Sequence, residues 1–356
     1  MKNVLATYIN GNYHVTLLND GTKIRYNKLN NLVPSFAESI DCNITEKCDG
    51  GCAYCYLGCN ENGKHADLNQ PFFNTLHKGQ ELALNGNDLT HPQLKEFLIR
   101  MKNQGVICNL TVNQIHFIRC IDEIRELTNE RLIHGLGISL VNSADSRLYD
   151  YLKEFSNAVL HTIDGLLTLE DLARLSNRNI KLLILGYKVL GRGDEYYNKH
   201  YNEINNNIDW LKHNIVHLKK AFKVISFDNL AIEHLDLKNQ IAHNIWEHSY
   251  MGDEGEFTFY IDAVNKKFAI SSLSSVQYDL KDNVDEMFEY IRNHRNEINN
   301  EKCAEWIEVY DHSRLAPIRR LSCSICKQEW LPEVASKFKY CPNCGAKIDE
   351  KCKESK

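Results

Sequence analysis

The sequence predicts an α/β protein: a partial (β/α)6 TIM-like barrel with an N-terminal β-meander and a small, cysteine-rich C-terminal unit. Six short apolar runs rich in β-branched residues alternate with helical segments from about residue 37 onward, which indicates parallel strands joined by helical crossovers. Alternating apolar and polar residues precede this series, and a shift in composition near residue 300 follows it. A doubly wound sheet is the competing arrangement for the central part.

The elements follow in chain order, within expected domains of residues 1–36, 37–300 and 301–356. In the first domain, Asn-Gly and Asp-Gly pairs favour tight hairpin turns over residues 2–26. The six strands are expected at 38–44, 81–86, 106–112, 134–141, 158–164 and 180–189. The helices are expected at 91–105, 114–129, 146–155, 168–177 and about 194–221, followed by a late antiparallel hairpin over 257–273 and a helix over 283–298.

Charge and composition narrow the class of protein. The formal net charge of -5 gives no basic field over the whole chain, so nucleic-acid binding through bulk electrostatics is not indicated. The N-terminus lacks the apolar region of a secretory signal, and no apolar run approaches the length of a membrane span. We therefore expect a cytoplasmic protein without membrane contact, in which the 13 cysteines indicate metal ligands or catalytic thiols rather than disulfides.

Three cysteines close together after the first expected strand have a special spacing. Cys48, Cys52 and Cys55 form the pattern CxxxCxxC, and Tyr54 precedes the last of them. A tight loop of this kind can bring three thiolates to three corners of one iron–sulfur cluster, and Gly50 lets the backbone fold closely around it. Three ligands leave one iron without a protein ligand, which is the open position that a reactive metal site needs. A zinc knuckle or a set of unconnected thiols is the alternative.

This loop, placed after the first strand of a βα series, resembles that of the radical SAM superfamily. The resemblance covers roughly residues 37–230 and is specific at the cysteines. It implies a [4Fe-4S] cluster bound by Cys48, Cys52 and Cys55, whose fourth iron chelates S-adenosylmethionine. It also implies an enzyme that reductively cleaves S-adenosylmethionine to a 5′-deoxyadenosyl radical, which abstracts hydrogen from a substrate. A one-electron donor such as flavodoxin or ferredoxin would supply the electron.

The resemblance further implies contacts between S-adenosylmethionine and the strand ends. Asn85-Gly86-Asn87-Asp88 stands where many members of the family carry a Gly-Gly-Glu-like turn, with the first glycine and the glutamate both replaced by asparagine. Ser139 and Asn142, at the end of the fourth strand, are candidates for binding the ribose. Ile163 and Gly165, at the end of the fifth, partly match the adenine motif of the family.

Substrate-side candidates follow from the barrel architecture, because side chains at the carboxyl ends of its strands face the site. This rule selects Thr111, Asn113, Lys188 and Arg192. Lys188 and Arg192 flank a glycine-containing loop and could hold a carboxylate or phosphate. The alternative is that both are solvated surface charges. Neither the substrate nor the product can be deduced from these residues.

The C-terminal unit carries a second cysteine pattern. Two CxxC pairs are formed by Cys323, Cys326, Cys341 and Cys344. This pattern is a strong signal for a zinc ribbon, in which a zinc ion bound by four thiolates stabilises the fold. A second iron–sulfur cluster is the alternative. Residues 301–356 contain more basic than acidic side chains, which is only weak support for nucleic-acid binding. The weakened turn at Asn85–Asn87 motivates a second functional hypothesis: a non-catalytic iron–sulfur and zinc protein that binds nucleic acid or has a regulatory role.

Overall fold

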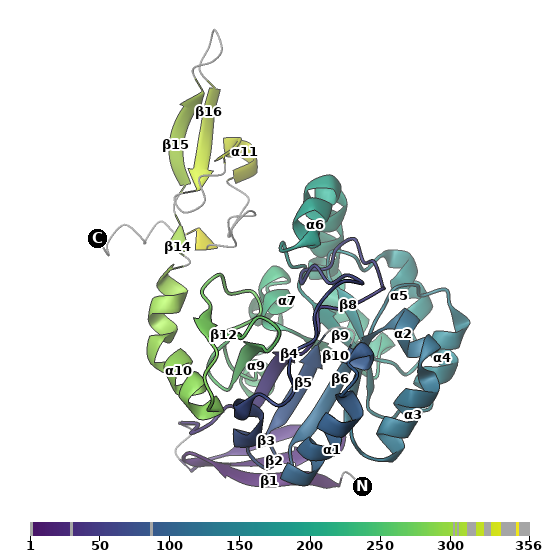
Figure 1. Cartoon of the computed structure of the whole chain (residues 1–356). Helices are drawn as coiled ribbons and strands as arrows, with labels where there is room; N and C mark the ends of the chain where they lie inside the picture. Colours follow the sequence, from purple (N-terminus) through teal and green to yellow (C-terminus); the bar gives the residue numbers. More distant parts are fainter. Residues whose placement is uncertain are drawn as a thin grey trace.

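The main body of the protein is a ten-stranded, mostly parallel sheet flanked by helices (Figure 1). The computed structural model describes residues 3–28, 31–85, 88–301, 303–304, 306–311, 318–323, 329–335 and 347–348. The sheet has the order β10-β9-β8-β7-β6-β5-β4-β11-β12-β13. Its strands are β4 (Ser39–Asn43), β5 (Glu81–Asn85), β6 (Ile107–Asn113), β7 (Gly135–Ser139), β8 (Ala158–Ile163), β9 (Lys181–Leu185), β10 (Val224–Phe227), β11 (Thr258–Asp262), β12 (Lys267–Ala269) and β13 (Tyr278–Asp279).

Strands β4 to β10 lie side by side in chain order, and every neighbouring pair is parallel. Buried and less buried residues alternate along β5, β8 and β9, as expected when helices cover one face only. Because a doubly wound sheet is covered on both faces, this alternation favours the barrel-like arrangement. The α/β prediction is therefore confirmed. Within the described residues the sheet stays open, with β10 and β13 as its edges.

Helices connect the parallel strands and supply the covered face of the sheet. They are α1 (Leu94–Gln104), α2 (Gln114–Arg119), α3 (Ile121–Asn129), α4 (Ser146–Leu152), α5 (Leu169–Leu175) and α6 (Arg192–Leu218), with the short helices η1 (Pro71–Thr75), η2 (Asp88–Thr90) and η3 (Lys219–Ala221). The expected single helix over 114–129 is wrong, because the chain breaks at Cys120 into α2 and α3. The expected long helix is present but kinks at His200.

Four strands extend the sheet beyond the six of the expected (β/α)6 series: β10 at one edge, and β11, β12 and β13 at the other. β10 follows α6 and pairs with β9, so the (β/α)6 count is too low. The late antiparallel hairpin is confirmed as β11 and β12, but β11 also pairs in parallel with β4 and so joins the main sheet. The chain reaches β11 from β10 through α7 (Asn229–His234), α8 (Leu237–Gln240) and α9 (His243–Ser249).

The expected meander is a three-stranded antiparallel sheet formed by β1 (Val4–Asn10), β2 (Tyr13–Leu18) and β3 (Lys23–Tyr26). Figure 1 shows it beneath the amino ends of the main strands. A buried charge network joins the two sheets: Arg25 donates two hydrogen bonds to Glu38, just before β4, and Lys23 pairs with both Glu38 and Glu81 of β5. The meander therefore covers the end of the sheet opposite to the cysteine loop.

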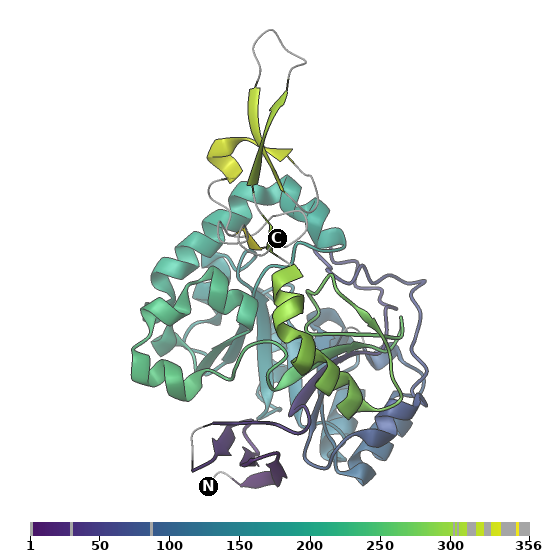
Figure 2. The same cartoon turned by 90° about the vertical axis from the view of Figure 1, so that its left-hand side faces the viewer.

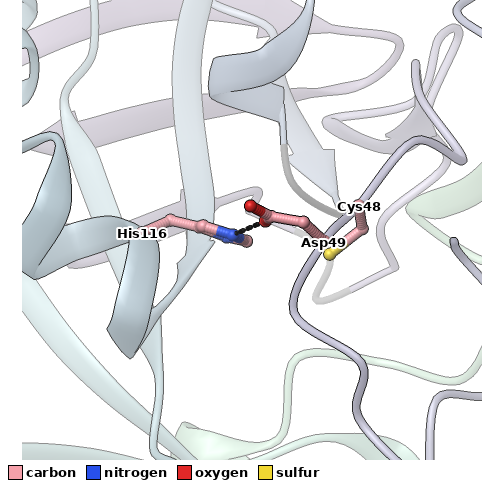
Figure 3. Close-up of side chains that lie close together, drawn as sticks. All are labelled: Cys48, Asp49 and His116. Atoms are coloured by element: carbon pink, nitrogen blue, oxygen red, sulfur yellow. Dashed lines mark hydrogen bonds and ion pairs between the residues drawn. The ribbon is translucent and has the colours of Figure 1, made fainter. Parts of the chain in front are cut away.

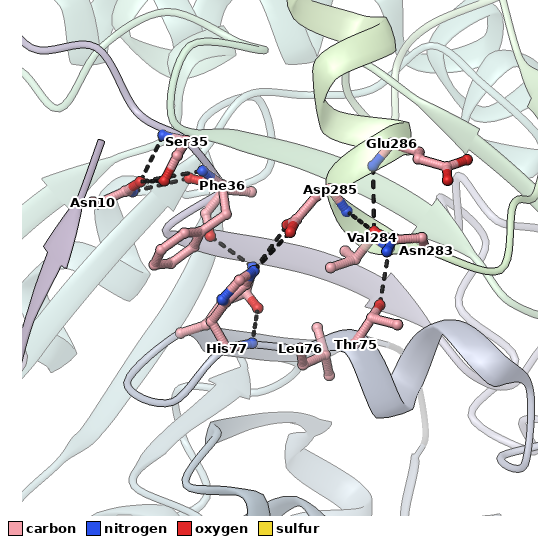
Figure 4. A network of polar contacts seen from close by, with 12 residues as sticks. Asn10, Ser35, Phe36, Thr75, Leu76, His77, Asn283, Val284, Asp285 and Glu286 are labelled. Atoms are coloured by element: carbon pink, nitrogen blue, oxygen red, sulfur yellow. Dashed lines mark hydrogen bonds and ion pairs between the residues drawn. The ribbon is translucent and has the colours of Figure 1, made fainter. Parts of the chain in front are cut away.

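A further polar network fixes α10 (Val284–Glu301) against the main sheet (Figure 4). The ring of His77 stacks on Phe36 and its Nε2 lies 2.9 Å from the carboxylate of Asp285 in the first turn of α10. The backbone N–H of Val284 donates to the hydroxyl of Thr75, at the end of η1. These contacts join three segments that lie far apart in the sequence.

The C-terminal part projects beyond α10, as Figures 1 and 2 both show. Its elements are β14 (Cys303–Ala304), β15 (Trp306–Asp311), β16 (Ile318–Cys323), β17 (Glu329–Trp330), α11 (Pro332–Ala335) and β18 (Lys347–Ile348). β15 pairs with β16, which pairs with β17, and β14 pairs with β18. None of the helices in the described ranges has the length and apolar character needed to cross a membrane.

Candidate functional site

The cysteine loop follows β4 and therefore lies at the carboxyl end of the parallel strands, where sites form in such sheets. Backbone hydrogen bonds brace the loop across its width: the Ala66 N–H donates to the carbonyl of Ile44, and the Cys48 N–H donates to the carbonyl of Asn60 at 2.9 Å. The hydroxyl of Thr45 lies 2.8 Å from Nδ1 of His65. The three cysteines thus belong to a hydrogen-bonded loop with a defined shape.

Hydrogen-bond donors surround the thiols of this loop. The Gly50 N–H donates to Sγ of Cys48 at 3.3 Å, and the side-chain amide of Asn113, at the end of β6, donates to Sγ of Cys52 at 3.4 Å. Burial raises the pKa values of Cys48 and Cys52 above the ordinary thiol value. A group that neutralises thiolate charge would remove this penalty, because metal binding favours the deprotonated sulfur.

Cys55 differs from the other two. A hydrogen bond from the thiol of Cys59 holds the pKa of Cys55 down to about 6, although burial acts in the opposite direction. Cys59 is buried, and its own pKa is raised by the same contact. From the sequence, Cys59 is interpreted as a bystander, with contact to the cluster rim or to a substrate as the alternative. In the structure its thiol contacts that of Cys55. Cys42, on β4, lies in the hydrophobic core of the sheet.

Arg192, at the start of α6, closes the loop from the other side. Its Nε donates to the carbonyl of Cys52 at 3.0 Å, and its Nη1 donates to the carbonyl of Cys59 at 2.9 Å. Its backbone N–H donates to the carbonyl of Cys55 at 3.1 Å. The sequence proposes Arg192 as a ligand for a substrate carboxylate or phosphate, but these contacts assign its guanidinium to the shape of the cysteine loop.

The residue before Arg192 makes this contact sterically possible. Gly191 has φ 55° and ψ -134°, a conformation that side chains rarely adopt. A Cβ at Gly191 would lie 2.5 Å from the carbonyl oxygen of Tyr56. Glycine is therefore needed both for the torsions and for the close approach of α6 to the loop.

We expect Gly191→Ala to destabilise the protein by roughly 2–4 kcal/mol, because backbone strain and the clash with Tyr56 add. Gly58→Ala is the matched control: Gly58 also has a positive φ of 67°, but a Cβ there meets nothing within 4 Å. Urea unfolding of both variants separates the two contributions. Equal loss of stability in the two would show that the close approach of α6 contributes nothing.

Lys188 lies beside the loop rather than on the outer surface. Its Nζ donates to the hydroxyl of Ser272 at 3.0 Å and lies 4.2 Å from the ring centroid of Tyr56, the neighbour of Cys55. Burial disfavours its charge, but Tyr56 and the carboxylates of Asp228 and Asp41 outweigh burial and raise the pKa of Lys188. The alternative of a solvated surface charge is therefore wrong for Lys188. The positively charged amine of Lys188 lies on the uncovered face of the sheet, beside Ser272 and Tyr56.

Asp41 shares this environment. It is exposed although it lies in the middle of β4, between two paired strands, and its neighbours along β4 are buried. Although solvent reaches its side chain, desolvation by the surrounding protein raises the pKa of Asp41 to about 6, and Lys188 partly offsets this. The uncovered face of the sheet therefore carries opposite charges close to the cysteine loop.

Those residues expected to bind S-adenosylmethionine that the structure describes lie at or just after the carboxyl ends of β5, β7 and β8. Asn85 ends β5, while Gly86 and Asn87 lie outside the described residues and Asp88 begins η2. Ser139 ends β7 and stands in register with Asn113 of the neighbouring strand. The side chain of Asn142 accepts a hydrogen bond from the Ala144 N–H and so shapes a turn.

The end of β8 packs against α6. A Cβ on Gly165 would lie 2.5 Å from a methyl group of Ile204, so helix packing alone requires glycine there. Ile163 packs against the same apolar cluster as Tyr54 of the cysteine loop. Between them, the fully buried Asp164 accepts hydrogen bonds from the Gly165 and Tyr187 N–H groups and pairs with His234. The sequence gives no indication of this carboxylate's role.

Three further residues at the loop, Asp49, His116 and Arg119, are not predicted from the sequence. Asp49 follows Cys48, and its carboxylate pairs with His116 of α2, as Figure 3 shows, and also with Arg119 of the same helix. These hydrogen bonds, from Arg119 first and then from His116, hold the pKa of Asp49 far below its usual range. The signal in the sequence is the spacing of three between Asn113, His116 and Arg119, which places them on one helix face.

The zinc prediction falls largely outside the described residues. Cys323 ends β16 and is buried. Cys326, Cys341 and Cys344 belong to the part of the chain that the structure does not describe. The four thiols therefore stay a sequence prediction.

Comparison with known proteins gives an informative match among solved structures. No family model matches the chain, and no curated protein is similar to it in sequence. Among solved structures, the fold is similar to that of SuiB from Streptococcus suis, whose crystal structure was determined with S-adenosylmethionine bound. The TM-score is 0.50 at 12% sequence identity, and the match covers 73% of this chain and 68% of SuiB. At this identity the match establishes a shared fold.

Proposed function

We propose that this protein is a radical SAM enzyme with a [4Fe-4S] cluster at Cys48, Cys52 and Cys55. The observation that carries the proposal is a braced loop with three thiols at the carboxyl end of a parallel sheet. When bound, the cluster and S-adenosylmethionine supply one-electron chemistry that begins with hydrogen abstraction from a substrate. A small electron-transfer protein such as flavodoxin or ferredoxin is the proposed electron donor.

The donor set of the loop fits an iron–sulfur cluster. Thiolates are its usual ligands, and N–H···S hydrogen bonds such as those from Gly50 and Asn113 are among the features that tune such clusters. Gly50 also leaves room: a Cβ there would lie 3.3 Å from Sγ of Cys48 and 3.6 Å from the amide of Asn113. The loop thus leaves space beside its sulfurs.

The proposed cofactor site extends from this loop along the neighbouring strand ends. The similarity to SuiB, which was crystallised with S-adenosylmethionine, supports a place for the same molecule here. Asn85 of β5, Ser139 of β7 and Ile163 of β8 are the candidates nearest to strand ends. Gly165 is the weakest, because packing against Ile204 already explains it.

The substrate would bind on the uncovered face of the sheet, below the loop. Lys188 and Asp41 offer one positive and one negative group there. His161, on the same face, stays neutral because burial lowers its pKa to about 4. These residues would orient a polar substrate by hydrogen bonds and charge.

Anaerobic reconstitution with iron and sulfide, followed by reduction in the presence of S-adenosylmethionine, tests the proposal. We expect about four iron atoms per chain and release of methionine and 5′-deoxyadenosine. A fully loaded cluster that yields no 5′-deoxyadenosine would contradict the enzyme and favour a non-catalytic iron–sulfur protein.

For the C-terminal unit we propose a structural zinc ion at Cys323, Cys326, Cys341 and Cys344. The two CxxC pairs support it. Metal analysis of the protein as isolated should give about one zinc per chain. Loss of that zinc in Cys341→Ala, with the iron content unchanged, would separate this site from the cluster. Iron in place of zinc would contradict it.

A further inference from the structure

One face of α2 is directed entirely at the cysteine loop. Asn113, His116 and Arg119 are spaced three residues apart, so their side chains follow one another along the same side of the helix. Each of the three contacts the loop between Cys48 and Cys52. Helix α2 has only six residues, and the chain turns at Cys120 directly after it.

Asp49 is the point on the loop that α2 holds. Arg119 donates to both carboxylate oxygens, Nη1 to Oδ2 at 2.8 Å and Nη2 to Oδ1 at 3.2 Å. His116 Nε2 also donates to Oδ1, and Figure 3 shows its ring pointing at the carboxylate. The His116 side chain is 1% exposed, whereas that of Arg119 is 51% exposed. The contact of His116 with Asp49 is therefore fixed by packing, whereas the contact of Arg119 with Asp49 is open to solvent.

Asn113 links the helix to a second point on the loop. Its Oδ1 accepts the Ile115 N–H at 2.8 Å and so caps the amino end of α2. Its Nδ2 donates to Sγ of Cys52. One amide thus joins the start of the helix to a proposed cluster ligand, and the strand β6 positions that amide.

We propose that Asn113, His116 and Arg119 form a template that holds the cysteine loop in its ligand geometry before the cluster binds. The three are positioning residues of the iron–sulfur site, and the inference rests on the proposed function. Without these contacts, the loop would lose conformational entropy when the cluster binds, and this loss would weaken cluster binding. Outer residues that orient metal ligands typically change metal affinity about 10–100-fold when they are removed.

A competing explanation of the same residues is a site for a single metal ion. One ligand atom each of Cys48, Asp49 and His116 lies within 4.8 Å of the others. The contacts of Asp49 argue against it, because Arg119 already occupies both carboxylate oxygens and its fixed positive charge would repel a cation. The amount of iron that the protein binds distinguishes the two explanations.

The test compares Asp49→Asn and His116→Gln with Glu154→Gln. Glu154 accepts two hydrogen bonds from Arg125, so its variant removes an equivalent carboxylate–arginine pair far from the loop. The reconstituted proteins are exposed anaerobically to a chelator, and iron release is followed by absorbance. We expect release to become about tenfold faster in the two loop variants and to stay unchanged in Glu154→Gln.

Asn113→Ser supplies a second readout. Serine keeps the helix cap but cannot reach Cys52 as the amide does, so helix stability is preserved. We expect the cluster to form with an altered electron paramagnetic resonance spectrum and a lower reduction potential, because one N–H···S bond is lost. Thermal unfolding of each variant without iron shows whether the fold itself is intact.

Three results would overturn the inference. The first is iron release from Asp49→Asn and His116→Gln that matches Glu154→Gln within error. The second is an unchanged spectrum in Asn113→Ser. The third is a single iron per chain that disappears in His116→Gln, which would establish the single-ion site. If the wild-type protein binds no iron at all, the proposed function itself is overturned, and the template that depends on it is overturned as well.

Discussion

Replacing Cys48, Cys52 or Cys55 by alanine is expected to reduce formation of 5′-deoxyadenosine to the level of a reaction without protein. Each replacement removes one of the three proposed thiolate ligands, and a [4Fe-4S] cluster is held by such thiolates. The iron content should fall with the activity. Reconstitution followed by quantification of iron and 5′-deoxyadenosine on the same samples measures both.

Cys59→Ala is the matched control from the same loop. Cys59 is buried and its thiol donates to Cys55, so its removal takes away a hydrogen bond and leaves all three proposed ligands in place. We expect this variant to keep its cluster and to lose no more than part of its activity. Complete loss of iron in Cys59→Ala would make it a ligand, and full iron in Cys52→Ala would remove Cys52 from the ligand set.

The repeating strands could be predicted from the sequence because their signal is local. β5, β8 and β9 are short apolar runs, each next to a helical segment with its own start and stop residues. β10 has only four residues after a long helix and gives no comparable pattern. The parallel pairing of β11 with β4 joins residues more than 200 positions apart, and nothing in either strand specifies the partner.

In the candidate site, too, local patterns can be recognised in the sequence but long-range contacts cannot. The cysteine spacing is a local pattern and can be recognised directly, and the rule for strand ends selects Asn113, which does contact Cys52. The role of Arg192 depends on where the start of α6 meets the loop, and this is a tertiary contact. Asp49 and His116 each look ordinary in sequence. Only the fold brings them together.

Glu38 is the residue outside the site whose change should cost the most stability. It is completely buried and accepts hydrogen bonds from Arg25 at 2.8 and 3.0 Å and from the hydroxyl of Tyr13 at 2.6 Å, with Lys23 at 3.2 Å. Glu38→Gln keeps the shape but leaves two nearly buried cations with less negative charge. Breaking a buried pair in this way costs roughly 3–5 kcal/mol. Glu126→Gln, at an exposed pair with Lys95, should change nothing measurable in the same denaturant titration.

The pH dependence of this difference identifies its electrostatic origin. Burial alone would raise the pKa of Glu38, but the hydrogen bond from Arg25 and the charge of Lys23 outweigh it and lower that pKa. A carboxyl whose pKa is lower in the folded state stabilises the protein above its unfolded pKa of about 4.3, and this stabilisation is lost as the pH falls through the folded value. Wild type and Glu38→Gln should therefore differ most near neutral pH and converge in acid, because glutamine resembles the protonated carboxyl. A difference that stays constant down to about pH 3 would assign the loss to packing, and the charge network beneath the sheet would then not be what attaches the meander to it.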